Sequence, residues 1–122
     1  MSTGFVGLGA MGFPMAANLS AASEAAGEQP TRVWNRTAAV SARHAQAHGT
    51  SAVANLAALH DCVLVAMCLP TSSVSKSVLE RLVPAMTSSN AVILDHTSGN
   101  PLETQALADR VRELSGGRVT CT

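Results

Sequence analysis

Short apolar segments alternate with longer, alanine-rich segments along all 122 residues of the chain. The apolar segments have the length of strands, and the segments between them carry apolar residues at helical spacing. We expect strands over residues 3–8, 31–35, 51–54, 62–69, 91–95 and 119–122. We expect helices over residues 11–22, 38–48, 56–60, 72–86 and 101–114. This alternation predicts an α/β fold with parallel strands, helices on both faces of the sheet and right-handed crossovers.

Composition narrows the class of protein. The length predicts one domain, and with 47% hydrophobic but only 2% aromatic residues its core must be aliphatic. A net charge of zero argues against nucleic-acid binding and against a polybasic membrane anchor. The apolar segments are far shorter than the roughly 20 residues of a membrane-spanning helix. Three cysteines without a secretory signal pattern favour a reducing compartment. We expect a cytoplasmic location, and a mitochondrial one stays open.

Three glycines form the pattern G-x-G-x-x-G between the first expected strand and the first expected helix. The first glycine permits a tight turn, the second lets a phosphate approach the backbone, and the third lets the helix pack on the strand. The N–H groups of the first helical turn then bind the phosphates. The pattern predicts a Rossmann-type doubly wound sheet that binds a dinucleotide; a turn that binds nothing is the alternative. The expected binding residues are Gly7, Leu8, Gly9, Ala10, Met11 and Gly12.

The end of the second expected strand reads Asn35-Arg36-Thr37 and carries no acidic residue. An acidic side chain there would bind the ribose hydroxyls of NAD and repel a ribose 2′-phosphate. Arg36 offers a guanidinium that can pair with that phosphate, and Thr37 offers a hydroxyl. We therefore expect NADP(H) as the cofactor, with NAD(H) less favoured. The alternative is a solvated Arg36 with Thr37 serving only as the N-cap of the next helix.

The segments GFVGLGAMGFPMAANL and VWNRT resemble the start of the β-hydroxyacid dehydrogenase family. That family includes 3-hydroxyisobutyrate dehydrogenase and short semialdehyde reductases, and its larger relative is 6-phosphogluconate dehydrogenase. The segments MCLPT and LDHTSGNP, at residues 67–71 and 94–101, are similar to later motifs of the same family. The resemblance covers the whole chain. It implies hydride transfer between nicotinamide and a small hydroxy acid or semialdehyde.

The resemblance also implies roles for residues in the two later segments. Leu69 and Pro70 would line the nicotinamide side, Thr97 would take the substrate position, and Ser98 would bind the cofactor. The order Thr97-Ser98 inverts the pair that is usual in the family. Residues 98–101 are also similar to the T-S-G-x-P segment of imine reductases. The substrate class therefore stays open between a small carboxylate and an imine.

The lysine that acts as the catalytic acid in the family lies on a long helix for which this sequence has no counterpart. Lys76 is the only lysine, and its position does not match, so we expect a solvated helix residue. We thus expect one domain over residues 1–122, truncated before the family's C-terminal helical domain and holding no catalytic residue. The alternative is a nucleotide-binding module without turnover.

The histidines do not predict a metal site or a catalytic role. His44 and His48 have the spacing of metal ligands on one helix, but no acidic or sulfur ligand is placed near them. We expect both on a solvated face and no metal site. His96 follows the fifth expected strand, at the edge where this fold binds ligands, and a structural role is favoured over substrate binding.

The last expected strand, residues 119–122, would form an edge of the sheet. Unpaired strand edges template association between chains. We therefore expect a homo-oligomer, with a small carboxylate as substrate and no nucleic-acid or membrane partner.

Overall fold

The computed structural model describes residues 2–97 and 100–122 and contains one parallel sheet of six strands in the order β3-β2-β1-β4-β5-β6. This is the strand order of a Rossmann-type doubly wound fold, as the sequence predicted. The strands are β1 (Thr3–Val6), β2 (Arg32–Trp34), β3 (Ser51–Ala52), β4 (Leu64–Met67), β5 (Ala91–Asp95) and β6 (Val119–Cys121). The helices are α1 (Gly12–Ala25), α2 (Ala38–His48), α3 (Ser72–Leu82) and α4 (Pro101–Ser115), with short 3-10 turns η1 (Leu56–Leu59) and η2 (Val83–Ala85).

Differences from the predicted elements lie at their ends. β3 contains only two residues, and α1 continues to Ala25 rather than stopping at residue 22. The helix predicted over residues 72–86 changes to a 3-10 turn at Val83 because Pro84 has no N–H for the helical hydrogen bond. No helix within residues 2–97 and 100–122 is long and apolar enough to cross a membrane.

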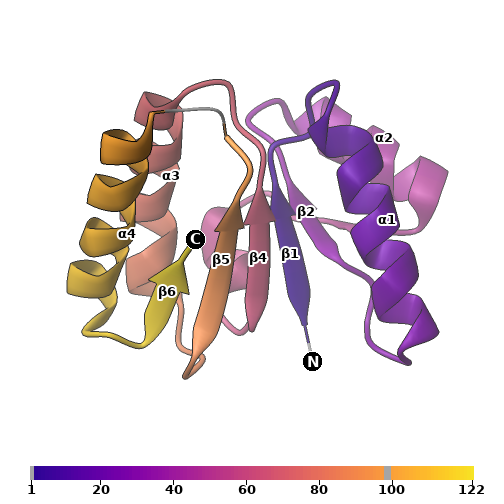
Figure 1. Ribbon diagram of the computed structural model, residues 1–122. Coiled ribbons are helices and arrows are strands. Elements are labelled where there is room, and N and C mark those ends of the chain that lie inside the picture. The colour runs from indigo at the N-terminus through magenta and orange to yellow at the C-terminus, as the bar shows by residue number, and fades with distance from the viewer. Residues whose placement is uncertain (1, 98–99) are drawn as a thin grey trace.

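Two helical layers cover opposite faces of the sheet (Figure 1). Neighbouring strand residues point to opposite faces, so Phe5 packs with Ala16 of α1 while Val6 packs into the cluster that contains Leu79 of α3. Apolar strands buried on both faces are expected of a parallel sheet. The cluster on the α3 and α4 face is the larger, and Val111 of α4 belongs to it.

The strand order reverses between β1 and β4, and this reversal places the ends of both strands side by side. The N–H of Cys68 donates to the Val6 carbonyl at 2.9 Å, and the N–H of His96 donates to the Met67 carbonyl at 2.8 Å. Ligands of doubly wound folds bind at such a switch point, outside the carboxyl ends of the strands. We therefore expect the ligand site among the loops that follow β1, β2, β4 and β5.

Candidate functional site

The glycine loop between β1 and α1 has two positions that exclude a side chain and one that leaves space. Gly7 has φ +98°, and a Cβ there would lie 2.2 Å from the carbonyl oxygen of Cys68. A Cβ on Gly12 would lie 2.0 Å from the carbonyl oxygen of Gly7. A Cβ on Gly9 would meet no atom within 4 Å. Gly7 and Gly12 are thus required by the turn itself, whereas Gly9 borders open space.

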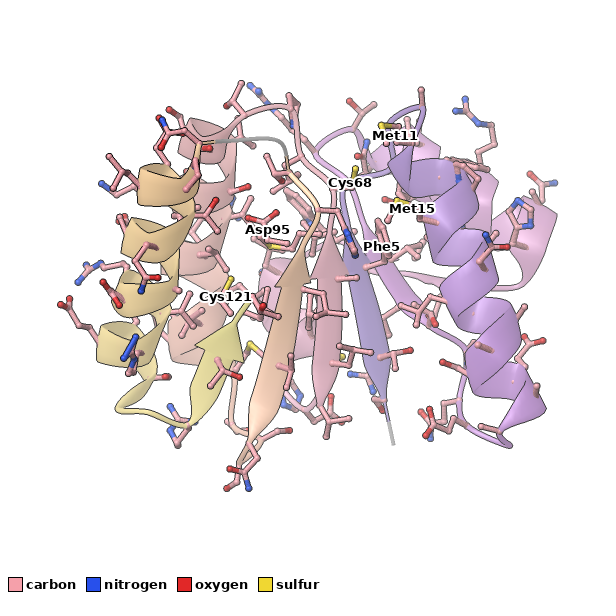
Figure 2. All side chains as sticks on the ribbon, in the orientation of Figure 1. Phe5, Met11, Met15, Cys68, Asp95 and Cys121 are labelled. Carbon is pink, nitrogen blue, oxygen red and sulfur yellow. The ribbon has the colours of Figure 1, made fainter. Side chains whose placement is uncertain are left out.

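The N-terminus of α1 faces the same open space. Met11 is the N-cap residue, its side chain makes no capping hydrogen bond, and it is 71% exposed. Figure 2 shows Met11 in the loop where α1 begins, beyond the carboxyl end of β1. In the first turn of α1 the Phe13 N–H donates to the Gly9 carbonyl at 2.9 Å and Pro14 has no N–H, so the N–H groups left to favour an anion are those of residues 10–12. Gly9 and the start of α1 therefore form a cradle that fits a phosphate group.

Asn35, directly after β2, holds the glycine loop in place. Its Oδ1 accepts a hydrogen bond from the N–H of Leu8 at 2.9 Å, and its Nδ2 donates to the carbonyl of Thr37 at 3.3 Å. The N–H of Gly7 donates to the carbonyl of Trp34 at 3.0 Å. The end of β2 and the loop after β1 are thereby joined by both backbone and side-chain hydrogen bonds.

Arg36 and Thr37 lie on the surface beside this loop. Thr37 is the N-cap residue of α2 with extended backbone, yet its hydroxyl makes no capping hydrogen bond. Arg36 is exposed and forms no side-chain hydrogen bond or ion pair with any residue in the ranges 2–97 and 100–122. Both polar groups are consequently available to a ligand at the end of β2.

Thr97, the predicted substrate residue, connects three elements. Its Oγ1 accepts hydrogen bonds from the N–H of Leu69 at 3.0 Å and from the hydroxyl of Ser75 at 2.9 Å. Its N–H donates to Oδ1 of Asp95 at 2.9 Å. Figure 2 places Asp95 and Cys68 near the carboxyl ends of β5 and β4. The Thr97 hydroxyl therefore already serves as an acceptor, and only its own proton is left to donate.

The other predicted residues around Thr97 differ in their exposure. Pro70 is exposed next to Leu69, and His96 is exposed at the same edge. Ser98 lies outside the described residues. Ser75 is fully buried on α3, and the sequence analysis missed its contact with Thr97. The N-cap position of Thr71 and the apolar spacing of α3 could have placed Ser75 on the inner face.

His44 contradicts the prediction that both α2 histidines are solvated. His44 is 0% exposed, with Nδ1 2.7 Å from the Thr50 hydroxyl and Nε2 2.9 Å from the Phe13 carbonyl. Since a carbonyl only accepts, Nε2 carries the proton and Nδ1 accepts from Thr50. Burial, the largest influence, lowers the pKa of His44 below its ordinary value. His48 is exposed, as predicted.

A groove of about 440 Å³ lies between the glycine loop and α2. The groove is lined by Leu8, Gly9, Ala10, Phe13, Val40 and Arg43. Arg43 was not among the residues predicted from the sequence to bind a ligand. Its spacing of one turn from the half-buried Val40 was the available signal. The open space at Gly9 thus continues into a groove whose lining includes Arg43.

A parallel sheet in this order, with a G-x-G-x-x-G turn at its switch point, defines a dinucleotide-binding domain. Residues 2–119 match the family model described as the NAD binding domain of 6-phosphogluconate dehydrogenase. The chain belongs to this family. A search of curated protein sequences finds no significant match.

Solved structures with this fold come from several related oxidoreductases. The chain is similar to 3-hydroxyisobutyrate dehydrogenase of Mycobacterium tuberculosis, with 21% identity, a TM-score of 0.81 and coverage of 98% of this chain and 38% of that one. It is similar to an imine reductase of Streptomyces aurantiacus, with 31% identity, a TM-score of 0.75 and coverage of 99% and 39%. It is also similar to a reductive aminase of Aspergillus terreus in complex with NADPH and ethyl-5-oxohexanoate, with 27% identity, a TM-score of 0.70 and coverage of 98% and 39%. The chain therefore spans well under half the length of each of these proteins.

Proposed function

We propose that this chain is the NADP(H)-binding domain of an oxidoreductase that transfers hydride between nicotinamide and a small hydroxy acid or semialdehyde. The observation that carries the cofactor choice is the end of β2, where Asn35, Arg36 and Thr37 follow the strand without an acidic residue. The Asn35 oxygen accepts from Leu8, so the position holds the loop without placing a negative charge beside a 2′-phosphate. The NADPH complex of the similar reductive aminase supports the same choice.

Each part of the dinucleotide has a set of groups suited to it. The open space at Gly9 and the first N–H groups of α1 would hold the pyrophosphate. The Arg36 guanidinium and the Thr37 hydroxyl would bind the 2′-phosphate through charge-assisted and neutral hydrogen bonds. Leu69 and Pro70 would border the nicotinamide, in a loop fixed by the hydrogen bond from Leu69 to Thr97. The bound cofactor supplies the hydride chemistry, and these residues set its orientation.

A small carboxylate is the proposed substrate, and its contact on this chain is Thr97. Because Thr97 Oγ1 accepts from Leu69 and Ser75, its own proton can donate to a substrate oxygen. A second candidate is imine reduction, which is favoured by the 31% identity with the Streptomyces aurantiacus imine reductase.

Turnover assays with the protein expressed from its whole coding sequence separate the two candidates. NADPH oxidation is followed by the loss of reduced-nicotinamide absorbance, with succinic semialdehyde or glyoxylate in one arm and a cyclic imine in the other. Oxidation with a semialdehyde supports the proposal. Oxidation with the imine alone replaces it with the second candidate, and no oxidation in either arm contradicts both.

Self-association is proposed as well, through the edge strand β6. The strand lies at one end of the sheet, with Thr120 exposed and Cys121 half-buried. Strand edges offer unpaired N–H and carbonyl groups to a second chain. Light scattering over a range of protein concentrations should show a mass that rises toward a dimer. A monodisperse monomer at the highest concentration would contradict this proposal.

A further inference from the structure

We propose that Arg43 is a second phosphate-binding arginine, which acts with Arg36 on the dinucleotide from the groove between the glycine loop and α2. The inference rests on the proposed binding of NADP(H). It extends that proposal to a residue outside the G-x-G-x-x-G turn and outside the end of β2. Three observations support it: Arg43 lines the groove, its guanidinium lies over the Phe13 ring, and no carboxylate lines the groove.

The position of Arg43 is set by α2. Val40 is half-buried and packs against the cluster that contains Phe5 and Ala16. Arg43 follows Val40 by three residues and therefore lies on the same side of the helix. Both side chains line the groove together with Gly9 and Ala10 of the glycine loop. Arg43 thus borders the space into which the first turn of α1 opens.

The ring of Phe13 supports the Arg43 guanidinium. The central carbon of the guanidinium lies 5.6 Å from the centroid of the Phe13 ring, within the range of a cation–π contact. Phe13 is in turn packed edge-on against His44, with 4.4 Å between ring centroids. His44 is itself held by hydrogen bonds with the Phe13 carbonyl and the Thr50 hydroxyl, so it packs against the Phe13 ring in a fixed position. The guanidinium is therefore positioned over the Phe13 ring by a cation–π contact, which uses none of its N–H groups.

Charges around the groove favour a phosphate. None of the groove-lining residues is acidic, and within residues 2–97 and 100–122 Arg43 forms no ion pair. Three other arginines form ion pairs: Arg32 with Asp61, Arg110 with Glu80, and Arg112 with Asp109. An uncompensated guanidinium beside exposed backbone N–H groups is suited to phosphate oxygens. Both the pyrophosphate and the ribose 2′-phosphate of the cofactor present this chemistry.

Calorimetric titration of Arg43→Met tests the proposal, because methionine retains an apolar contact with Phe13 and removes the charge. The probes are adenosine 2′,5′-bisphosphate, ADP, NADPH and NADH. The matched control is Arg112→Met, which removes an exposed arginine of α4. We expect Arg43→Met to weaken binding by roughly tenfold, the lower end for a charge-assisted hydrogen bond, because Arg43 is exposed. Arg112→Met should bind as the parent does.

The probes separate the two phosphate groups. A loss confined to adenosine 2′,5′-bisphosphate and NADPH assigns Arg43 to the 2′-phosphate, and a loss that includes ADP and NADH assigns it to the pyrophosphate. Parental affinity of Arg43→Met for all four probes overturns the inference and leaves the proposed function intact. A parent that binds none of the probes overturns both.

Arg43→Lys distinguishes a lost charge from a disturbed groove. Lysine keeps the positive charge, so this variant should recover part of the affinity, and the difference between it and Arg43→Met should shrink as salt is added. Equal losses in both variants, unaffected by salt and accompanied by a lower unfolding temperature, would overturn the inference in favour of a packing role.

Discussion

The side-chain oxygen of Asn35 accepts a hydrogen bond from the N–H of Leu8, with 2.9 Å between the two atoms. Asn35 follows β2, and Leu8 lies in the glycine loop after β1. One neutral side chain thus links the segment that would bind the 2′-phosphate to the segment that would bind the pyrophosphate. Replacing this amide by a carboxylate changes the charge at the site while keeping an oxygen for Leu8.

Asn35→Asp should therefore shift the preference between cofactors while it keeps the bond to Leu8 and gives up only the 3.3 Å bond to the Thr37 carbonyl. The added charge would repel a 2′-phosphate and weaken NADPH binding, while the ribose hydroxyls of NADH gain an acceptor. We expect the ratio of NADPH to NADH affinity to fall by about tenfold or more, as measured by calorimetry. Asn35→Ala is the control: it removes the bond to Leu8, and both cofactors should bind more weakly. An unchanged ratio in Asn35→Asp would count against the cofactor assignment.

Gly9→Ala and Gly12→Ala should separate binding from folding. A Cβ at Gly9 meets no atom within 4 Å, so that variant should unfold at the same urea concentration as the parent yet bind NADPH poorly, because the methyl group occupies the phosphate cradle. A Cβ at Gly12 would lie 2.0 Å from the Gly7 carbonyl oxygen and should destabilise the fold itself, by about 1–3 kcal/mol. A stable Gly12→Ala variant, or full NADPH affinity in Gly9→Ala, would be inconsistent with this structure of the loop.

His44 should make folding stability depend on pH. Burial lowers its pKa in the folded state, and the neighbouring His48 lowers it further. As the pH falls below about 6.5, the unfolded chain takes up the proton first, so stability is present above that pH and is lost toward the lower folded-state pKa. Urea unfolding at several values between about pH 7.5 and 5 should show a steeper loss for the parent than for His44→Gln. Equal slopes for the parent and His44→Gln would contradict this role of His44.

Thr97→Val tests whether the Thr97 hydroxyl fastens the loops after β4 and β5. Valine keeps the shape and removes the acceptor of the Leu69 N–H and the Ser75 hydroxyl, and Ser75 is fully buried. The free energy of unfolding should fall by about 1–3 kcal/mol, which urea unfolding measures. Thr97→Ser keeps the acceptor and should lose clearly less. Equal stability of the parent and Thr97→Val would show that these hydrogen bonds make no net contribution to the free energy of unfolding.

The alternation of strands and helices and the glycine turn could be predicted because local sequence determines them. Alternation of segments dictates β-α repetition, and the contacts at Gly7 and Gly12 follow from a strand turning directly into a helix. Pro84 also indicates the early end of α3, although the predicted helix extended to residue 86.

The burial of His44 could not be predicted from local sequence. Its partner Phe13 precedes it by 31 residues, and only the packing of α1 against α2 brings the two together. The same packing creates the groove beside Arg43. Helical spacing identifies which residues share a face, but it does not say which neighbouring element that face will meet.

Titration of the protein with NADPH and NADH, for the parent and Arg36→Ala, tests the central claim most directly. Trp34 is the only tryptophan and lies two residues before Arg36, so quenching of its emission reports binding. The parent should prefer NADPH, and Arg36→Ala should lose about tenfold or more of its NADPH affinity while its NADH affinity changes little. Equal affinity of the parent for both cofactors, or equal loss of both in Arg36→Ala, would contradict the assignment of the 2′-phosphate site.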